Sequence, residues 1–192
     1  PHTSSRRQRQ MCIRDRVTSK PVVGVGRYTS PDAVVALIKN GQLDMIGAAR
    51  PSIADPFFPK KVEEGRLEDI RECIGCNICV SGDHHSVPIR CAQIPTMDEE
   101  WRKGWIPERI APRSADESVL IVGAGPASLE AARALGQRGY RVTLADSVSH
   151  AGGRVAKERN LLGLGEWGRV ADYRHYQISQ MANVELFLES HM

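Results

Sequence analysis

Residues 118–146 read SVLIVGAGPASLEAARALGQRGYRVTLAD, and this stretch decides the fold of the C-terminal part of the chain. The apolar run VLIV predicts a strand that enters a glycine turn, and the Ala- and Leu-rich stretch from Pro126 to Gly139 predicts a helix. The run YRVTLAD, residues 140–146, predicts a second strand that ends in an acidic residue. This order of elements indicates a parallel α/β sheet of the doubly wound, Rossmann-like type.

The glycine turn has the pattern G-x-G-x-x-S, with Gly123, Gly125 and Ser128 at the fixed positions. The first glycine allows a tight turn, and the second lets a pyrophosphate approach the backbone. Asp146 follows about twenty residues later, where an acid commonly binds a ribose 2′-hydroxyl. In this context the motif predicts an adenine dinucleotide site, although a doubly wound domain that binds nothing remains the alternative.

Gly152, Gly153 and Arg154 follow the second strand, and they either close over the dinucleotide or form a simple turn. Residues 166–181 predict a further helix and residues 184–189 a third strand. We therefore assign residues 116–192 to a Rossmann-like domain that holds FAD or ADP. The chain ends before such a domain would be complete.

Four cysteines lie in the run CIGCNICVSGDHHSVPIRC, residues 73–91, with the spacing C-x2-C-x2-C-x11-C. Bacterial ferredoxin-type sites begin with the same C-x2-C-x2-C pattern, whereas zinc sites more often use two separated cysteine or histidine pairs. The spacing favours one [4Fe–4S] cluster, with zinc as the alternative. The predicted ligands are Cys73, Cys76, Cys79 and Cys91. Residues 67–115 have weak periodicity, and we assign them to an iron–sulfur segment and linker.

Residues 17–66 predict two βα units, which by themselves cannot bury both faces of a sheet. We expect them to be the last two units of an FMN-binding (β/α)8 barrel whose beginning is absent. The first predicted strand, residues 21–26, ends in Gly24 and Gly26, and Arg27 follows it. Ala49 and Arg50 end or follow the second, residues 43–49. In such a barrel these positions bind phosphate, and a solvent-facing arginine is the alternative.

The chain has 192 residues and a net charge of +3, but residues 1–16 hold five arginines and one aspartate. We interpret this stretch, which contains Cys12, as a non-native tail, with a nucleic-acid arm and a transit peptide as alternatives. No apolar stretch approaches the roughly 18 residues of a membrane span. Cluster-type cysteines fit a reducing compartment, so we expect a cytoplasmic protein that binds neither membrane nor nucleic acid.

Taken together, the chain resembles the flavoprotein family of trimethylamine and dimethylamine dehydrogenases and 2,4-dienoyl-CoA reductase. The similar stretches run from about residue 20 to 170: GVGRYTSPD, IGAARPSIADPFFPKKVEEGR, IRECIGCNICV, IPTMDEEWRKGW and VLIVGAGPASLEAARALGQRGY. The resemblance implies that Arg27, Ala49 and Arg50 hold the FMN phosphate. It also implies that Gly123, Gly125, Ala127 and Asp146 contact ADP or FAD. Two departures are Ser128 in place of the usual glycine and eleven rather than twelve residues before Cys91.

The resemblance implies an oxidoreductase that depends on FMN and [4Fe–4S], most similar to amine dehydrogenases that pass electrons through the cluster to an electron-transfer flavoprotein. An NAD(P)H-dependent 2,4-dienoyl-CoA or enoate reductase is the alternative, and a non-catalytic cluster- or zinc-binding module is the alternative from another class. The substrate is accordingly an amine or an enoyl compound. The catalytic residues would lie in absent barrel strands, so we name none and expect the isolated chain to be inactive. The oligomeric state is open, with a homo-oligomer as one alternative.

Overall fold

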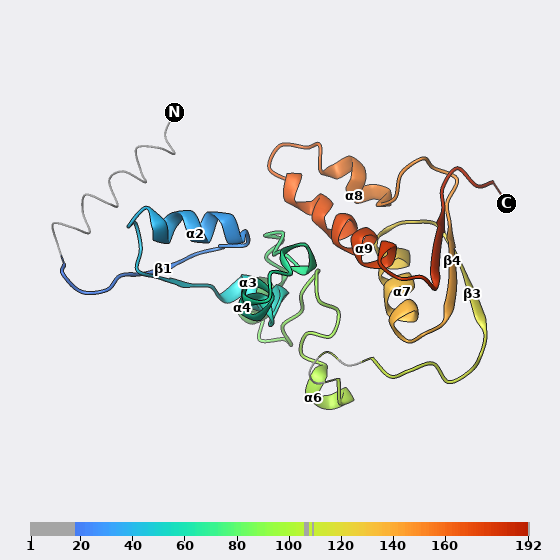
Figure 1. The fold of residues 1–192 in the computed structure, drawn as a ribbon, viewed down its shortest axis with the longest axis horizontal. Coiled ribbons are helices and arrows are strands. Elements are labelled where there is room, and N and C mark those ends of the chain that lie inside the picture. Colours follow the sequence, from blue (N-terminus) through green and yellow to red (C-terminus); the bar gives the residue numbers. More distant parts are fainter. Residues whose placement is uncertain (1–17, 106–107, 109, 192) are drawn as a thin grey trace.

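The computed structural model describes residues 18–105, 108 and 110–191, so the N-terminal tail and Cys12 lie outside the described residues. Figure 1 shows two βα units, then the cysteine-containing segment, then a sheet with its helices. Both sheets are parallel, which confirms the α/β fold class.

The first unit begins with strand β1 (Val23–Val25), which pairs in parallel with β2 (Met45–Gly47). Helix α2 (Pro31–Lys39) connects the two strands, begins with a proline in its first turn and ends at Asn40. Proline suits the first helical position because it has no N–H to leave unpaired there. The order of strand, helix and parallel strand confirms the first predicted βα unit.

The second strand is shorter than predicted, because β2 ends at Gly47 opposite the last residue of β1. Ala49, which we expected at the end of this strand, instead begins helix α3 (Ala49–Ala54). Helix α4 (Phe58–Glu63) follows. The prediction that the strand extends to Ala49 was wrong: Ala48 beyond the last paired residue is still extended, and it serves as the N-cap from which α3 starts.

The cysteine segment contains short helices that its sequence did not predict: η1 (Leu67–Asp69), α5 (Ile78–His84) and α6 (Glu100–Lys103). Helix α5 follows Asn77, whose φ of 60° is left-handed. Its apolar residues Ile78 and Val80 are 46% and 39% exposed. The helix therefore buries no continuous apolar stripe, and its sequence lacks the helical period by which helices are recognised.

The C-terminal sheet has the order β3-β4-β5, formed by Ser118–Val122, Arg141–Ala145 and Val184–Phe187. Helix α7 (Pro126–Gln137) joins β3 to β4, and helix α9 (Arg169–Ser179) precedes β5. These elements confirm the predicted strands and helices of the Rossmann-like domain to within a few residues.

Two further short helices, α8 (Gly153–Glu158) and η2 (Gly165–Gly168), lie between β4 and α9. Helix α8 begins at the Gly152–Gly153 pair, with Gly152 as its N-cap in a left-handed conformation. The pair is therefore more than a simple turn, and its closure over a dinucleotide stays a prediction.

Helices α7 and α9 cover one face of this sheet (Figure 1). The core between them contains the fully buried Leu129 of α7 and Leu144 of β4. On the opposite face Leu120, Val122 and Phe187 are 58%, 65% and 48% exposed. The alternation of buried and exposed residues along β3 and β5 follows the period of two that a strand requires.

A buried chain of polar contacts connects the βα units to the C-terminal domain. The carboxylate of Asp55 accepts hydrogen bonds from Lys61 Nζ at 2.7 Å and from the backbone N–H of Arg71 at 2.9 Å. The Arg71 guanidinium then lies 5.2 Å from the ring centre of Tyr173 on α9. Arg71 is only two positions before Cys73. These contacts therefore hold the start of the cysteine loop between Asp55 on one side and Tyr173 on the other.

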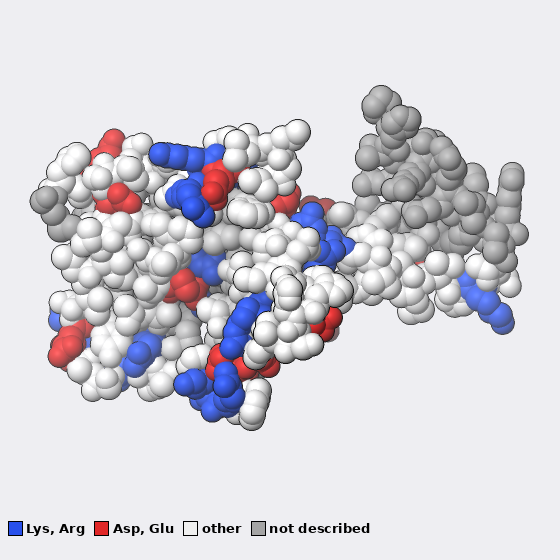
Figure 2. Space-filling view, turned by 180° about the vertical axis from the view of Figure 1, so that it is seen from behind, with Lys and Arg blue, Asp and Glu red and all other residues white. Residues whose placement is uncertain are grey.

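Charged residues of both signs are interspersed on the face of the molecule that Figure 2 shows. No helix among the described residues has the length and apolarity needed to cross a membrane.

Candidate functional site

The cysteine loop places Cys73 and Cys76 before α5, Cys79 within its first turn, and Cys91 in the following loop. All four are free thiols, and only Cys79 is buried. Burial raises the pKa of Cys73, whereas the nearby Arg27 and Arg50 act in the opposite direction. The two arginines therefore offset part of the effect of burial on the Cys73 thiol.

The chemistry of this donor set fits an iron–sulfur cluster. A [4Fe–4S] cluster takes one thiolate at each of its four irons, and ferredoxin-type sites begin with the C-x2-C-x2-C pattern. The loop supplies four free cysteines, the first three of them in that pattern. Within the described ranges, no three side chains of the His, Cys, Asp and Glu types are grouped so that they could hold a single metal ion.

The two arginines predicted to bind phosphate both contact the cysteine loop. Arg27 Nη1 donates to the carbonyl oxygen of Cys73 at 3.3 Å, and Arg50 Nη1 donates to Asn77 Oδ1 at 2.5 Å. A Cβ atom on Gly75 would lie 2.8 Å from Arg27 Nη1, so the arginine packs directly over this glycine. Sequence reasoning assigned these arginines to a separate site and missed their contact with the loop.

Both arginines follow the carboxyl ends of parallel strands: Gly24 is in the middle of β1, Gly26 directly follows it, and Ala49 follows β2. Ligands of α/β sheets and barrels bind at these ends. A guanidinium has five N–H donors, and the hydrogen bond to the loop uses one donor of each arginine. The remaining donors suit a phosphate group beside the cysteine loop.

The glycine turn lies between β3 and α7. Gly123 has a φ of +91°, and Gly125 is the N-cap of α7. The N–H of Gly152 donates to the carbonyl of Ala124 at 2.7 Å, and a Cβ on Gly153 would lie 3.1 Å from the Cα of Gly125. The Gly152–Gly153 pair thus packs against the glycine turn. A side chain at Gly153 would crowd the backbone of Gly125.

Ala127 and Arg154 were also predicted to contact the nucleotide. Ala127 is exposed in the first turn of α7, close to the glycine turn. The side chain of Arg154 is 85% exposed, and its Nε lies 2.9 Å from Glu158 on the same helix. The described contacts of Arg154 therefore do not bring it to the glycine turn.

Asp146 holds the glycine turn, a role that sequence reasoning did not assign to it. Its Oδ2 accepts a hydrogen bond from the N–H of Ala124 at 2.6 Å, and its Oδ1 accepts one from the N–H of Val148 at 3.2 Å. These two backbone donors lower the pKa of Asp146 below its ordinary value. Because a carboxylate has about four acceptor positions, one side chain has capacity for both the turn and a ribose hydroxyl.

We expect the contribution of Asp146 to produce a pH-dependent loss of stability. Its lowered pKa means that the folded chain binds fewer protons than the unfolded chain, so its stabilisation is complete above the ordinary pKa of about 3.9 and is lost as pH falls through the lowered value. Urea unfolding of the native chain and Asp146→Asn between about pH 2.5 and pH 6 measures this. Parallel stability curves for the two proteins would contradict the prediction.

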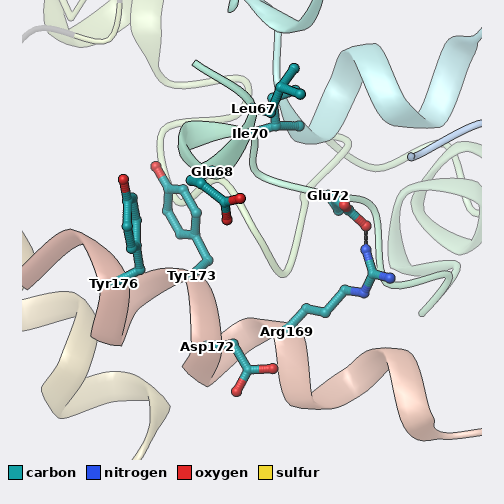
Figure 3. A pocket seen from close by; sticks show the side chains of 8 residues that line it. All are labelled: Leu67, Glu68, Ile70, Glu72, Arg169, Asp172, Tyr173 and Tyr176. Atoms are coloured by element: carbon teal, nitrogen blue, oxygen red, sulfur yellow. Dashed lines mark ion pairs between the residues drawn. The ribbon is translucent and has the colours of Figure 1, made fainter. Parts of the chain in front are cut away.

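A cavity of 270 Å³ lies between η1 and α9, next to the cysteine loop. Figure 3 shows Glu72, the residue before Cys73, in an ion pair with Arg169, while Tyr173 and Tyr176 line the other end. These residues were not predicted, since a sequence gives no signal for a cavity between two distant segments.

Two family models match the chain. The model described as "NADH:flavin oxidoreductase / NADH oxidase family" matches residues 1–69, and "NAD(P)-binding Rossmann-like domain" matches residues 121–187. Their order agrees with the two groups of elements on either side of the cysteine segment.

Among curated proteins, the chain is 52% identical to dimethylamine dehydrogenase of Hyphomicrobium sp. (strain x) over 167 residues, which is 86% of the chain and 23% of that protein. It is 34% identical to NADH oxidase of Thermoanaerobacter brockii over 142 residues, or 73% of the chain and 21% of that protein. The chain thus spans less than a quarter of the length of these relatives.

Among solved structures, histamine dehydrogenase from Rhizobium sp. 4-9 is 62% identical with a TM-score of 0.88, covering 92% of this chain and 26% of that one. A 2-naphthoyl-CoA reductase is 30% identical with a TM-score of 0.88, covering 97% of this chain and 28% of that one. The arrangement of the elements described above is therefore similar in both proteins.

Proposed function

Because the chain belongs to the NADH:flavin oxidoreductase / NADH oxidase family, we propose that its protein is an amine dehydrogenase that depends on FMN and a [4Fe–4S] cluster. The observation that carries this proposal is the contact of Arg27 and Arg50 with the cysteine loop. Two arginines at strand ends, each hydrogen-bonded to a loop that carries free cysteines, suit a flavin phosphate and a cluster held side by side. The high identity to dimethylamine dehydrogenase and histamine dehydrogenase supports amines as the substrate class.

In this proposal each group of residues has a separate task. Arg27, Arg50 and the backbone after β1 and β2 bind the FMN phosphate, and the four cysteines bind the cluster. Bound FMN and cluster would supply two-electron oxidation of the substrate and one-electron transfer to an external acceptor. The contacts from Arg27 and Arg50 fix the cysteine loop relative to the phosphate site, which keeps the distance between the two groups constant.

The glycine turn and Asp146 bind the ADP portion of an adenine nucleotide. The turn offers the N–H groups at the start of α7 to a pyrophosphate, a favourable position for an anion. ADP and FAD present this same portion, and in the amine dehydrogenase proposal the site holds ADP as a structural group. We propose residues 17–66, 67–115 and 116–192 as the corresponding barrel, cluster and nucleotide portions.

A second candidate is an NAD(P)H-dependent enoyl-CoA or enoate reductase, in which the nucleotide site holds FAD. The similarity to 2-naphthoyl-CoA reductase favours this candidate, although the identity is about half that to histamine dehydrogenase.

Reduction of the flavin in the complete gene product distinguishes the two candidates. We expect dimethylamine, trimethylamine or histamine to bleach the flavin absorbance under anaerobic conditions, and NADH and NADPH to leave it unchanged over the same period. Bleaching by NADPH together with oxidation by an enoyl-CoA, in the absence of any response to amines, would reject the amine dehydrogenase proposal in favour of the reductase.

A further inference from the structure

Arg174 on α9 connects the nucleotide domain to the cysteine loop. Its side chain is 3% exposed, and its Nε lies 2.7 Å from Oε2 of Glu130 on α7. Its Nη1 donates to Gln93 Oε1 at 3.0 Å, and its Nη2 donates to the backbone carbonyl of Gln93, also at 3.0 Å. One buried guanidinium thus binds a single residue of the cysteine segment through two parallel hydrogen bonds.

Gln93 transmits this contact to both ends of the cysteine set. It is 1% exposed, and its backbone N–H donates to the Sγ of Cys91 at 3.4 Å. Its side-chain Nε2 donates to the carbonyl of Glu72, next to Cys73, at 2.8 Å. A buried glutamine with its amide oxygen, amide nitrogen and backbone all bonded has little freedom to move. Gln93 therefore fixes Cys91 relative to the chain that leads into Cys73.

The buried charged groups around Arg174 carry a net positive charge. Glu130 lies 2.6 Å from Arg133 Nη2 as well as 2.7 Å from Arg174, so two buried guanidiniums share one carboxylate. Burial lowers the pKa of Arg174, but a guanidinium stays protonated in proteins. A buried cation acts through a medium of low dielectric constant, where its field is screened less than at the surface.

We propose that Arg174, acting through Gln93, is a positioning residue that holds Cys91 and raises the reduction potential of the cluster bound by the four cysteines. This inference rests on the proposed function, because it presupposes the cluster. Reduction adds one electron to a group that already carries four thiolates, so a nearby buried cation stabilises the reduced state. Hydrogen bonds to ligand sulfur atoms and net charge around the cluster are established determinants of its potential.

The test is a redox titration, followed by electron paramagnetic resonance, of the chain reconstituted with iron and sulfide. In Arg174→Gln the buried charge is lost, while Glu130 keeps its pair with Arg133. In Gln93→Glu an anion is added beside Arg174 with almost no change in volume. We expect each variant to reduce the ratio of reduced to oxidised cluster at least tenfold at a fixed potential, a downward shift of about 59 mV for one electron.

Arg141→Gln is the matched control, because it removes one positive charge from an exposed position at the start of β4 in the same domain. Arg174→Lys keeps the charge but cannot make both hydrogen bonds to Gln93, and it should shift the potential less than Arg174→Gln. Midpoints of Arg174→Gln and Gln93→Glu within the range of Arg141→Gln overturn this inference and leave the cluster proposal intact. If these two variants have the circular dichroism of the unaltered chain but take up no cluster, the claim about the reduction potential is overturned. Failure of the unaltered chain to take up iron and sulfide overturns both proposals.

Discussion

Replacing Cys76 with serine should abolish the iron–sulfur cluster. We expect iron to fall from about four atoms per chain to less than one after anaerobic reconstitution, with a parallel loss of acid-labile sulfide, because the cluster needs four thiolates. Cys76 lies between Gly75 and Asn77, which have φ values of 70° and 60°. This left-handed backbone fixes the path of the loop, so a neighbouring residue cannot readily take the place of the lost thiolate. Iron and sulfide analysis with visible absorbance measures the effect.

The chain contains a matched control for this experiment. Cys12 is the fifth cysteine of the sequence and lies outside the described residues. Because Cys12 lies outside the C-x2-C-x2-C-x11-C pattern of the four predicted ligands, Cys12→Ser should retain the full iron and sulfide content. A full cluster in Cys76→Ser would refute the assignment of the four ligands, and zinc without sulfide in the unaltered chain would replace the cluster with the zinc alternative.

Replacing Asp55 with alanine should destabilise the chain by about 3–5 kcal/mol, the usual cost of breaking a buried ion pair by removing one partner. Asp55 is 2% exposed and Lys61 is 8% exposed, and Lys61 Nζ lies 2.7 Å from the carboxylate. The carboxylate also accepts the backbone N–H groups of Arg71 and Phe57. The substitution therefore leaves a buried ammonium whose remaining partners are the backbone carbonyl of Asp69 at 2.7 Å and its carboxylate at 3.7 Å, and it leaves two backbone donors without this acceptor. Urea unfolding measures the change.

Two further variants separate the buried charge from the side chain itself. Lys61→Met in the Asp55→Ala background removes the buried ammonium that has lost its Asp55 partner, and it should recover part of the lost stability. Glu64→Ala removes an exposed partner of Arg66 and should change the unfolding midpoint little, since exposed ion pairs are screened by solvent. An equally small effect for Asp55→Ala and Glu64→Ala would show that the buried pair does not stabilise the fold.

The Rossmann-like unit could be predicted from sequence because its signals are local. Strand β3, the glycine turn and helix α7 occupy Ser118–Gln137 without interruption. Each signal acts within a few residues: alternation for a strand, a glycine for positive φ, and a proline in the first helical turn. Helix α5 gave no such signal, because its apolar residues are partly exposed and it starts at a left-handed asparagine.

The residues of each site could be predicted from their type and spacing. The contacts between one site and another could not. Nothing in the sequence indicated that Arg27 would donate to the carbonyl of Cys73, which is 46 positions away. Asp146 was recognised as a residue at a strand end, but its bond to the N–H of Ala124 was not. Such contacts depend on where the backbone of one element lies relative to another, and no short pattern contains that information.

The sequence by itself determined the α/β fold class, the glycine turn, the candidate cysteines and the order of the segments. These features depend on period and spacing along the chain, which follow from the geometry of helices, strands and turns. Only the tertiary structure decided that Arg27 and Arg50 meet the cysteine loop and that Arg174 reaches Gln93, 81 positions earlier in the chain. The physical reason is that burial of a charged side chain depends on the packing of α7 and α9 against the sheet, and an arginine in a sequence carries no mark of whether that packing will enclose it.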